Sequence, residues 1–200
     1  MIRRTDALAG LAAGSFVLAL AGLGAAMEGY SQALHPPALL GAQQQPWALA
    51  FNLFGFALPG VLGALVMIAL RGRLDGARWA PRIGSWLWLL SAVAFAAQGL
   101  LPLDLTDIDA PIGHLHASAW TLWWLAFVPG GVLIALGAGP AGRAYGSLRV
   151  AAIVAAMLLP LFTLYAPLGL PAGASQRIGL ALWFAAMLVA GVAARRPPQR

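Results

Sequence analysis

Six stretches of the chain contain no Asp, Glu, Lys or Arg, and short polar or charged segments separate them. They cover residues 7–27, 47–70, 83–101, 115–138, 150–165 and 178–194. An apolar helix of about 20 residues crosses the hydrocarbon core of a bilayer, and about 17 residues suffice with little tilt. Lipid offers no hydrogen bonds, so a spanning segment must pair its own backbone as a helix. The pattern predicts an all-α, polytopic membrane bundle of six transmembrane helices.

The connections between these stretches are short. The longest, residues 29–46, has 18 residues, which leaves no room for a soluble domain. The stretches are also too continuously apolar for the alternating strands of an outer-membrane barrel. We therefore expect residues 1–200 to form a single transmembrane domain.

The arginines fall almost entirely on one side of this topology. Eleven of the twelve lie at the termini, between the second and third stretches, or between the fourth and fifth. Only Arg177 lies on the other side, together with four of the six acids. Because cytoplasmic loops are rich in Lys and Arg, both termini are predicted to be cytoplasmic, in a bacterial inner membrane.

The first stretch has an alternative interpretation as a cleaved signal peptide, because Arg3 and Arg4 precede it and the small residues Gly24-Ala25-Ala26 lie near its end. Its apolar run of about 21 residues is longer than the usual 7–15 of a signal peptide. Asp6 also lies in the segment that is normally basic. We therefore expect the first helix to be retained.

Composition supports the membrane class and excludes several others. Charged residues make up 9% of the chain, against about 25% in soluble domains. The net charge of +6 comes from arginines placed between apolar runs, so it indicates topology and not a nucleic-acid partner. The chain has no cysteine, which excludes disulfides, thiolate metal sites and cysteine nucleophiles.

No ionisable residue lies near the centre of a predicted span, where proton-coupled transporters usually place one. Polar residues gather instead at the outer ends of the helices. We expect an outward-facing pocket there, with apolar walls and a few convergent polar groups. Its proposed ligand-binding residues are Asn52, Asp104, His116 and Arg177, with Glu28 nearby.

Each of these residues also has a plainer interpretation. Asp104 is either an acid–base or metal carboxylate or part of a solvated loop. His114 and His116 lie about 200° apart on a helix, so they can share a metal only if the helix begins after His114. They are weak metal candidates, and no metal or cofactor is expected. Arg177 either clamps an anionic group or pairs with Glu28 or Asp104.

Glycines at helical spacing add close-packing faces, beginning with the GxxxG step of Gly10 and Gly14. Gly60, Gly63, Gly130 and Gly131 provide further small faces. With 24 glycines in the chain, packing within the bundle is favoured over a dimerisation site. The oligomeric state stays open.

Three short motifs resemble the bacterial six-helix membrane family known as domain of unknown function 998. Pro37-Ala-Leu-Leu-Gly41 with Phe51-Asn52 resembles its Ser-x-Leu-Gly…Phe-Asn pattern. Leu101-Pro-Leu-Asp104 with His116 resembles Phe-Pro-x-Asp…His, and Gln176-Arg177-Ile178 resembles Glu-Arg-Ile. The chain departs from the family at Ala38, Leu101 and Gln176, where Ser, Phe and an acid are usual. The resemblance implies the six-helix fold and the site placement, and the family's function is unassigned.

These observations favour a protein that binds a lipid or small amphiphile in the outward pocket. The alternative is a membrane-embedded hydrolase with His116 and Asp104 as base or metal ligands and Arg177 on an anionic head group. A third possibility is a transporter of an uncharged solute. The expected partner in every case is the lipid bilayer.

Overall fold

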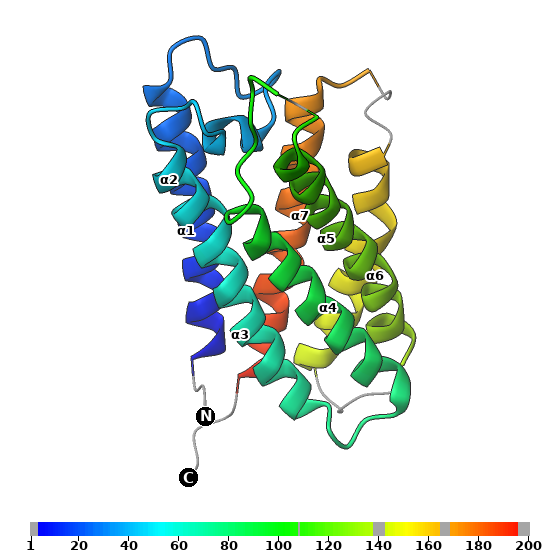
Figure 1. The fold of residues 1–200 in the computed structure, drawn as a ribbon. Coiled ribbons are helices and arrows are strands. Elements are labelled where there is room, and N and C mark those ends of the chain that lie inside the picture. The colour runs from blue at the N-terminus through cyan, green and yellow to red at the C-terminus, as the bar shows by residue number, and fades with distance from the viewer. Residues whose placement is uncertain (1–3, 108, 138–142, 165–168, 196–200) are drawn as a thin grey trace.

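The computed structural model describes residues 4–107, 109–137, 143–164 and 169–195. In these residues six helical segments are long and apolar enough to cross a membrane, and they run side by side as a bundle (Figure 1). The elements are α1 Thr5–Ala26, η1 Pro37–Gly41, α2 Ala48–Phe51, η2 Asn52–Ala57, α3 Leu58–Arg73, α4 Trp79–Gln98, α5 Pro111–Leu136, α6 Arg143–Leu164 and α7 Ala172–Ala194. The predicted fold class is confirmed.

The helices extend beyond the charge-free stretches. The last turn of α3 contains Arg71 and Arg73, and α6 begins at Arg143. Long arginine side chains reach water from the end of a membrane helix, so a charged residue does not mark a helix end. The expected helix ends at positions 138 and 165 lie outside the described residues.

The start of α1 and the end of α7 lie together at one end of the bundle (Figure 1). The Thr5 hydroxyl donates to the Gly191 carbonyl at 2.7 Å, and Arg195 forms an ion pair with Asp6 at 3.2 Å. The loops before η1 and before α5 lie at the opposite end, which we call the distal end. The predicted outer polar residues therefore occupy a single end of the bundle.

Aromatic side chains fill the centre of the bundle. The Phe95 ring of α4 lies 4.7 Å from Trp183 of α7 and 6.0 Å from Trp123 of α5, measured between ring centroids. Phe16 of α1 contacts both Phe95 and Phe184. Such aromatic contacts contribute beyond the apolar area that they bury, and they join α1 to the other helices.

Glycines set the closest helix approaches. A Cβ atom added at Gly60 would lie 2.4 Å from the Ala96 backbone nitrogen, so α3 and α4 meet almost backbone to backbone. A Cβ atom at Gly130 would likewise overlap the Trp88 ring. At Gly10 and Gly14 an added Cβ meets nothing within 4 Å. The GxxxG step of α1 therefore faces away from its own bundle.

The second spanning segment contains a π-helical turn. η2 separates α2 from α3, and the helix is continuous from Ala48 to Arg73. A π turn adds one residue to an α-helix and weakens its local hydrogen bonding. The Ser15 hydroxyl of α1 donates to the Phe54 carbonyl within η2 at 2.6 Å. A neighbouring helix thus supplies a hydrogen bond inside this turn.

Candidate functional site

Asn52, the first residue of η2, secures the distal loop. Its side chain is 7% exposed, and its Nδ2 donates to the Gly41 carbonyl at 2.8 Å. This hydrogen bond offsets part of the free energy that is lost when the amide is removed from water. A Cβ atom at Gly41 would overlap the Asn52 amide, so the approach requires glycine at that position. Asn52 therefore holds the end of η1 against the second spanning segment.

His116 lies on the inner face of α5, where it is 6% exposed. Its Nδ1 lies 2.8 Å from the Leu101 carbonyl oxygen. A carbonyl can only accept, so Nδ1 must carry the proton that is donated. In the neutral ring Nε2 is then an acceptor. The Phe56 ring packs edge-on against the imidazole at 6.1 Å and helps to fix its orientation.

His116 lines a partly open recess of about 240 Å³ at the distal end. The walls come from the loop at η1, from η2, from the loop after α4, and from α5 and α7. The lining residues are Pro36, Pro37, Ala38, Phe56, Leu103, His116, Ala117, Trp120 and Gln176. None of these side chains carries a formal charge when His116 is neutral. The recess is a largely apolar chamber, and its polar groups are the His116 imidazole, the Gln176 amide and the indole N–H of Trp120.

Asp104 belongs to the loop between α4 and α5. Its Oδ1 accepts from the Thr106 backbone N–H at 2.8 Å, the Thr106 hydroxyl at 2.6 Å and the Gln44 amide at 2.5 Å. Hydrogen bonds from Thr106, with a further bond from Gln44, lower the pKa of the Asp104 carboxyl below its usual value. Asp104 thus joins two distal loops, and its described partners do not include His116.

Arg177 ties the loop before η1 to the start of α7. Its Nε donates to Gln32 Oε1 at 3.0 Å, and its Nη1 donates to the carbonyls of His35 and Gly173, both at 2.8 Å. Its Nη2 donates to the Tyr30 hydroxyl at 2.6 Å. We call this group of five residues the Arg177 clasp. Most of the guanidinium N–H groups are already bonded within the protein.

The expected pairing of Arg177 with Glu28 or Asp104 is not among the described contacts. Glu28 is exposed and lies beyond the last residue of α1. Burial raises the pKa of Tyr30 above its usual value, and the opposing charge of Arg177 offsets part of this effect. Neutral acceptors of the loop therefore take the place of a carboxylate beside Arg177.

The two neighbouring histidines point to different sides of α5. The helix begins at Pro111, before His114, so the condition for a shared metal is not met. His114 is exposed, whereas His116 is buried. Among the described residues, no group of three or more His, Asp or Glu side chains is arranged to hold a metal ion. The Ser118 hydroxyl donates to the His114 carbonyl at 2.8 Å.

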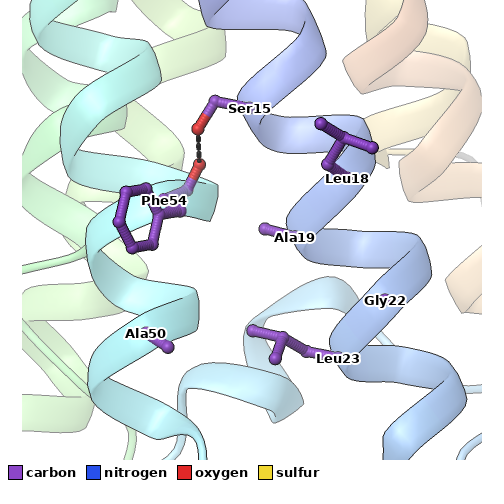
Figure 2. Close-up of a pocket in the computed structure, with 7 residues that line it drawn as sticks. All are labelled: Ser15, Leu18, Ala19, Gly22, Leu23, Ala50 and Phe54. Atoms are coloured by element: carbon purple, nitrogen blue, oxygen red, sulfur yellow. Dashed lines mark hydrogen bonds between the residues drawn. The ribbon is translucent and has the colours of Figure 1, made fainter.

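A second recess, of about 310 Å³, opens between α1 and the start of the second spanning segment. Figure 2 shows Leu23 of α1 and Ala50 of the second spanning segment pointing toward each other across it, with the bond from Ser15 to Phe54 at one edge. It shares no lining residue with the recess at His116. This lateral groove is apolar and of a size to accept part of a lipid chain, but it does not continue the distal recess.

The structure thus separates residues that the sequence had grouped. Of the five proposed ligand-binding residues, only His116 lines the distal recess, and Asn52, Asp104 and Arg177 each hold a loop in place. Sequence reasoning missed the wall made by Phe56, and it left the helical stripe of His116, Trp120 and Trp124 open between a site and packing. For Trp120 the signal was present, because it lies one turn after His116 on the same helical stripe.

The three motifs that carry the family resemblance nevertheless meet at the distal end. Gly41 bonds Asn52, Leu101 bonds His116, and Gln176 faces the same recess as His116. Comparison with protein-family models, with curated proteins and with solved structures finds no match to this chain.

Proposed function

We propose that this protein binds a lipid or small amphiphile in the distal recess beside His116. In this proposal the bundle spans a bacterial inner membrane with cytoplasmic termini, so that the recess faces outward. The orientation is supported by the sequence, in which eleven of the twelve arginines fall in the terminal segments and in the connections predicted to be cytoplasmic. The observation that carries the proposal is an apolar recess of about 240 Å³ that contains one oriented imidazole.

The chemistry of the recess suits a largely apolar ligand with one polar group. Trp120, Phe56 and the two prolines supply apolar wall, which favours burial of a hydrocarbon segment. Nε2 of His116 offers one acceptor, and the Gln176 amide offers a donor and an acceptor. A ligand with a hydroxyl or amide head group would match these groups.

The hydrolase alternative has no specific contact in its favour. A base at His116 would need Asp104, Ser118 or a metal within hydrogen-bond reach. Among the described residues, His116 bonds the Leu101 carbonyl, Asp104 bonds the neighbouring loops, and Ser118 bonds the His114 carbonyl. Lipid binding is therefore the function that we carry forward.

Photocrosslinking in nanodiscs tests the proposal directly. The probe is hexadecan-1-ol with a diazirine in its chain, and mass spectrometry maps the labelled residues. We expect labelling to concentrate on peptides from η1 and from the start of α5. Ala117→Trp fills the recess with an indole and should abolish this labelling.

Leu115→Trp is the matched control. Leu115 lies on the same helix, is exposed, and does not line the recess. It should leave the labelling unchanged. Equal labelling in the Ala117→Trp protein, or labels spread evenly over the exposed faces of all helices, would refute the proposal. Native mass spectrometry of gently extracted protein should also detect a retained lipid, less abundant in Ala117→Trp.

A further inference from the structure

Three buried polar atoms lie in the contact between α4 and α5 without a partner among the described residues. They are Nε2 and Oε1 of Gln98 and Nε1 of Trp123. Both side chains are fully enclosed, at 0% exposed. Buried amide and indole N–H groups are almost always hydrogen-bonded, because an unpaired polar group in an apolar interior is costly. The three atoms therefore need a hydrogen-bond partner that the described residues do not supply.

The register of the two helices sets how far apart this pair lies along the bundle. α4 and α5 run antiparallel, with the Trp88 ring stacked on Phe127 at 4.8 Å and the Leu101 carbonyl bonded to His116. This register places position 118 of α5 opposite Gln98. Trp123 lies five residues further along α5, a rise of about 7.5 Å at about 1.5 Å per residue.

The directions of the two side chains reduce this separation, because they lean toward each other along the bundle. Side chains on a helix lean toward the N-terminus of that helix. The Gln98 amide therefore leans toward the middle of the bundle, and the Trp123 indole leans toward the distal end. The Phe95 ring lies 6.0 Å from the Trp123 ring, and Phe95 is one turn before Gln98 on the same face of α4.

We propose that Gln98 and Trp123 form an internal binding site for one hydroxyl group. A hydroxyl has one donor and two acceptor positions. It donates to Gln98 Oε1 and accepts from the Trp123 indole N–H, while Gln98 Nε2 supplies a second donor. An ion is disfavoured, because the surrounding Phe95 and Trp183 side chains carry no charge to balance it. Water and an alcohol head group share this chemistry.

Trp120 separates this site from the distal recess. Its side chain lines the recess on one side, and its ring lies 4.7 Å from that of Trp123. An alcohol head group from the recess would reach the site only if the Trp120 ring moved. Water satisfies the same groups without any ligand in the recess, so the inference stands apart from the proposed function.

Nuclear magnetic resonance of the whole protein tests the site. The protein is labelled with ¹⁵N-tryptophan in phospholipid nanodiscs, and Trp123→Phe assigns the Trp123 indole resonance. Cross-relaxation of the indole proton is then measured before and after adding dodecan-1-ol. A contact to a long-lived water identifies water as the occupant, and a contact to the alcohol C1 methylene identifies the alcohol.

Gln98→Leu removes the amide at similar volume and should abolish either contact. Gln98→Met serves as a second variant if the leucine protein does not fold. Gln43→Leu is the control, because Gln43 is exposed in the distal loop and should change nothing. The inference is overturned if the indole proton contacts only the Gln98 amide protons, contacts neither hydroxyl source, or behaves identically in the Gln98 variants.

Discussion

Replacing Arg177 by Gln removes the guanidinium that ties the loop before η1 to α7. The wild-type side chain makes four hydrogen bonds, three of them partly buried and one, to Gln32, exposed. The bond to Gly173 stays within α7, so two partly buried bonds hold the loop. A net value of about 1 kcal/mol for each of these and nearly nothing for the exposed one gives about 2 kcal/mol. This energy stabilises the closed loop locally.

Hydrogen–deuterium exchange of the loop measures this change. When opening and closing are fast, the exchange rate follows the population of the open state. A loss of about 2 kcal/mol should therefore speed exchange in residues 30–36 about 30-fold, since about 1.4 kcal/mol corresponds to tenfold. Arg177→Lys keeps the charge but loses the planar fork, and we expect its exchange rate to lie between those of the wild type and Arg177→Gln.

Arg73→Gln provides the control, because it makes the same chemical change at an exposed position on the opposite end of the bundle. It should leave exchange of the loop unchanged. Exchange in the Arg177→Gln protein that stays within threefold of wild type would show that the clasp contributes little, and our reasoning about these bonds would be wrong. Acceleration spread over all helices would indicate global destabilisation.

Three further predictions concern packing, pH and the amide of η2. Gly60→Ala should lower the thermal unfolding midpoint, because its Cβ meets the α4 backbone, whereas Gly14→Ala should be neutral or slightly stabilising; equal midpoints would contradict the close approach. Burial raises the pKa of Tyr30, so the neutral phenol contributes its full share to folding stability below about pH 10, and this share is lost as pH rises through the raised pKa. The free energy of unfolding, measured by denaturation, should therefore fall less at alkaline pH in Tyr30→Phe than in the wild type. Asn52→Ala should cost about 1–3 kcal/mol by leaving the Gly41 carbonyl unpaired, and unchanged denaturant stability would count against that bond.

The spans were predictable because one physical rule dominates them. A segment in lipid must be apolar and helical, so the six helices followed from the chain's apolar stretches. The helix ends were less predictable, since Arg71 and Arg143 lie inside helices that the charge pattern would end or begin elsewhere. An arginine at the membrane interface can keep its backbone helical while its long side chain carries the charge into water.

The site was predictable only in its location. Polar residues at one end indicated the distal face, but a single chain does not reveal which side chains are already bonded. Arg177 resembled an anion clamp, yet its hydrogen bonds are accepted by two oxygens of the loop, by the Gly173 carbonyl of α7 and by the Tyr30 hydroxyl. Gln98 lies near one end of the third apolar stretch, among the polar residues that the sequence places there, yet it is fully enclosed. Both outcomes depend on tertiary contacts that local pattern does not encode.

The π turn at η2 sets a rotational offset within one continuous helix. Removing a single residue between positions 53 and 57 would restore regular α geometry and rotate everything before it by about 100° relative to α3. Gly60 would still meet Ala96, but Asn52 would turn away from Gly41. The extra residue therefore lets the outer turns of the segment face the distal loop while its inner turns face α4. A one-residue deletion there would be more damaging to the recess than most substitutions.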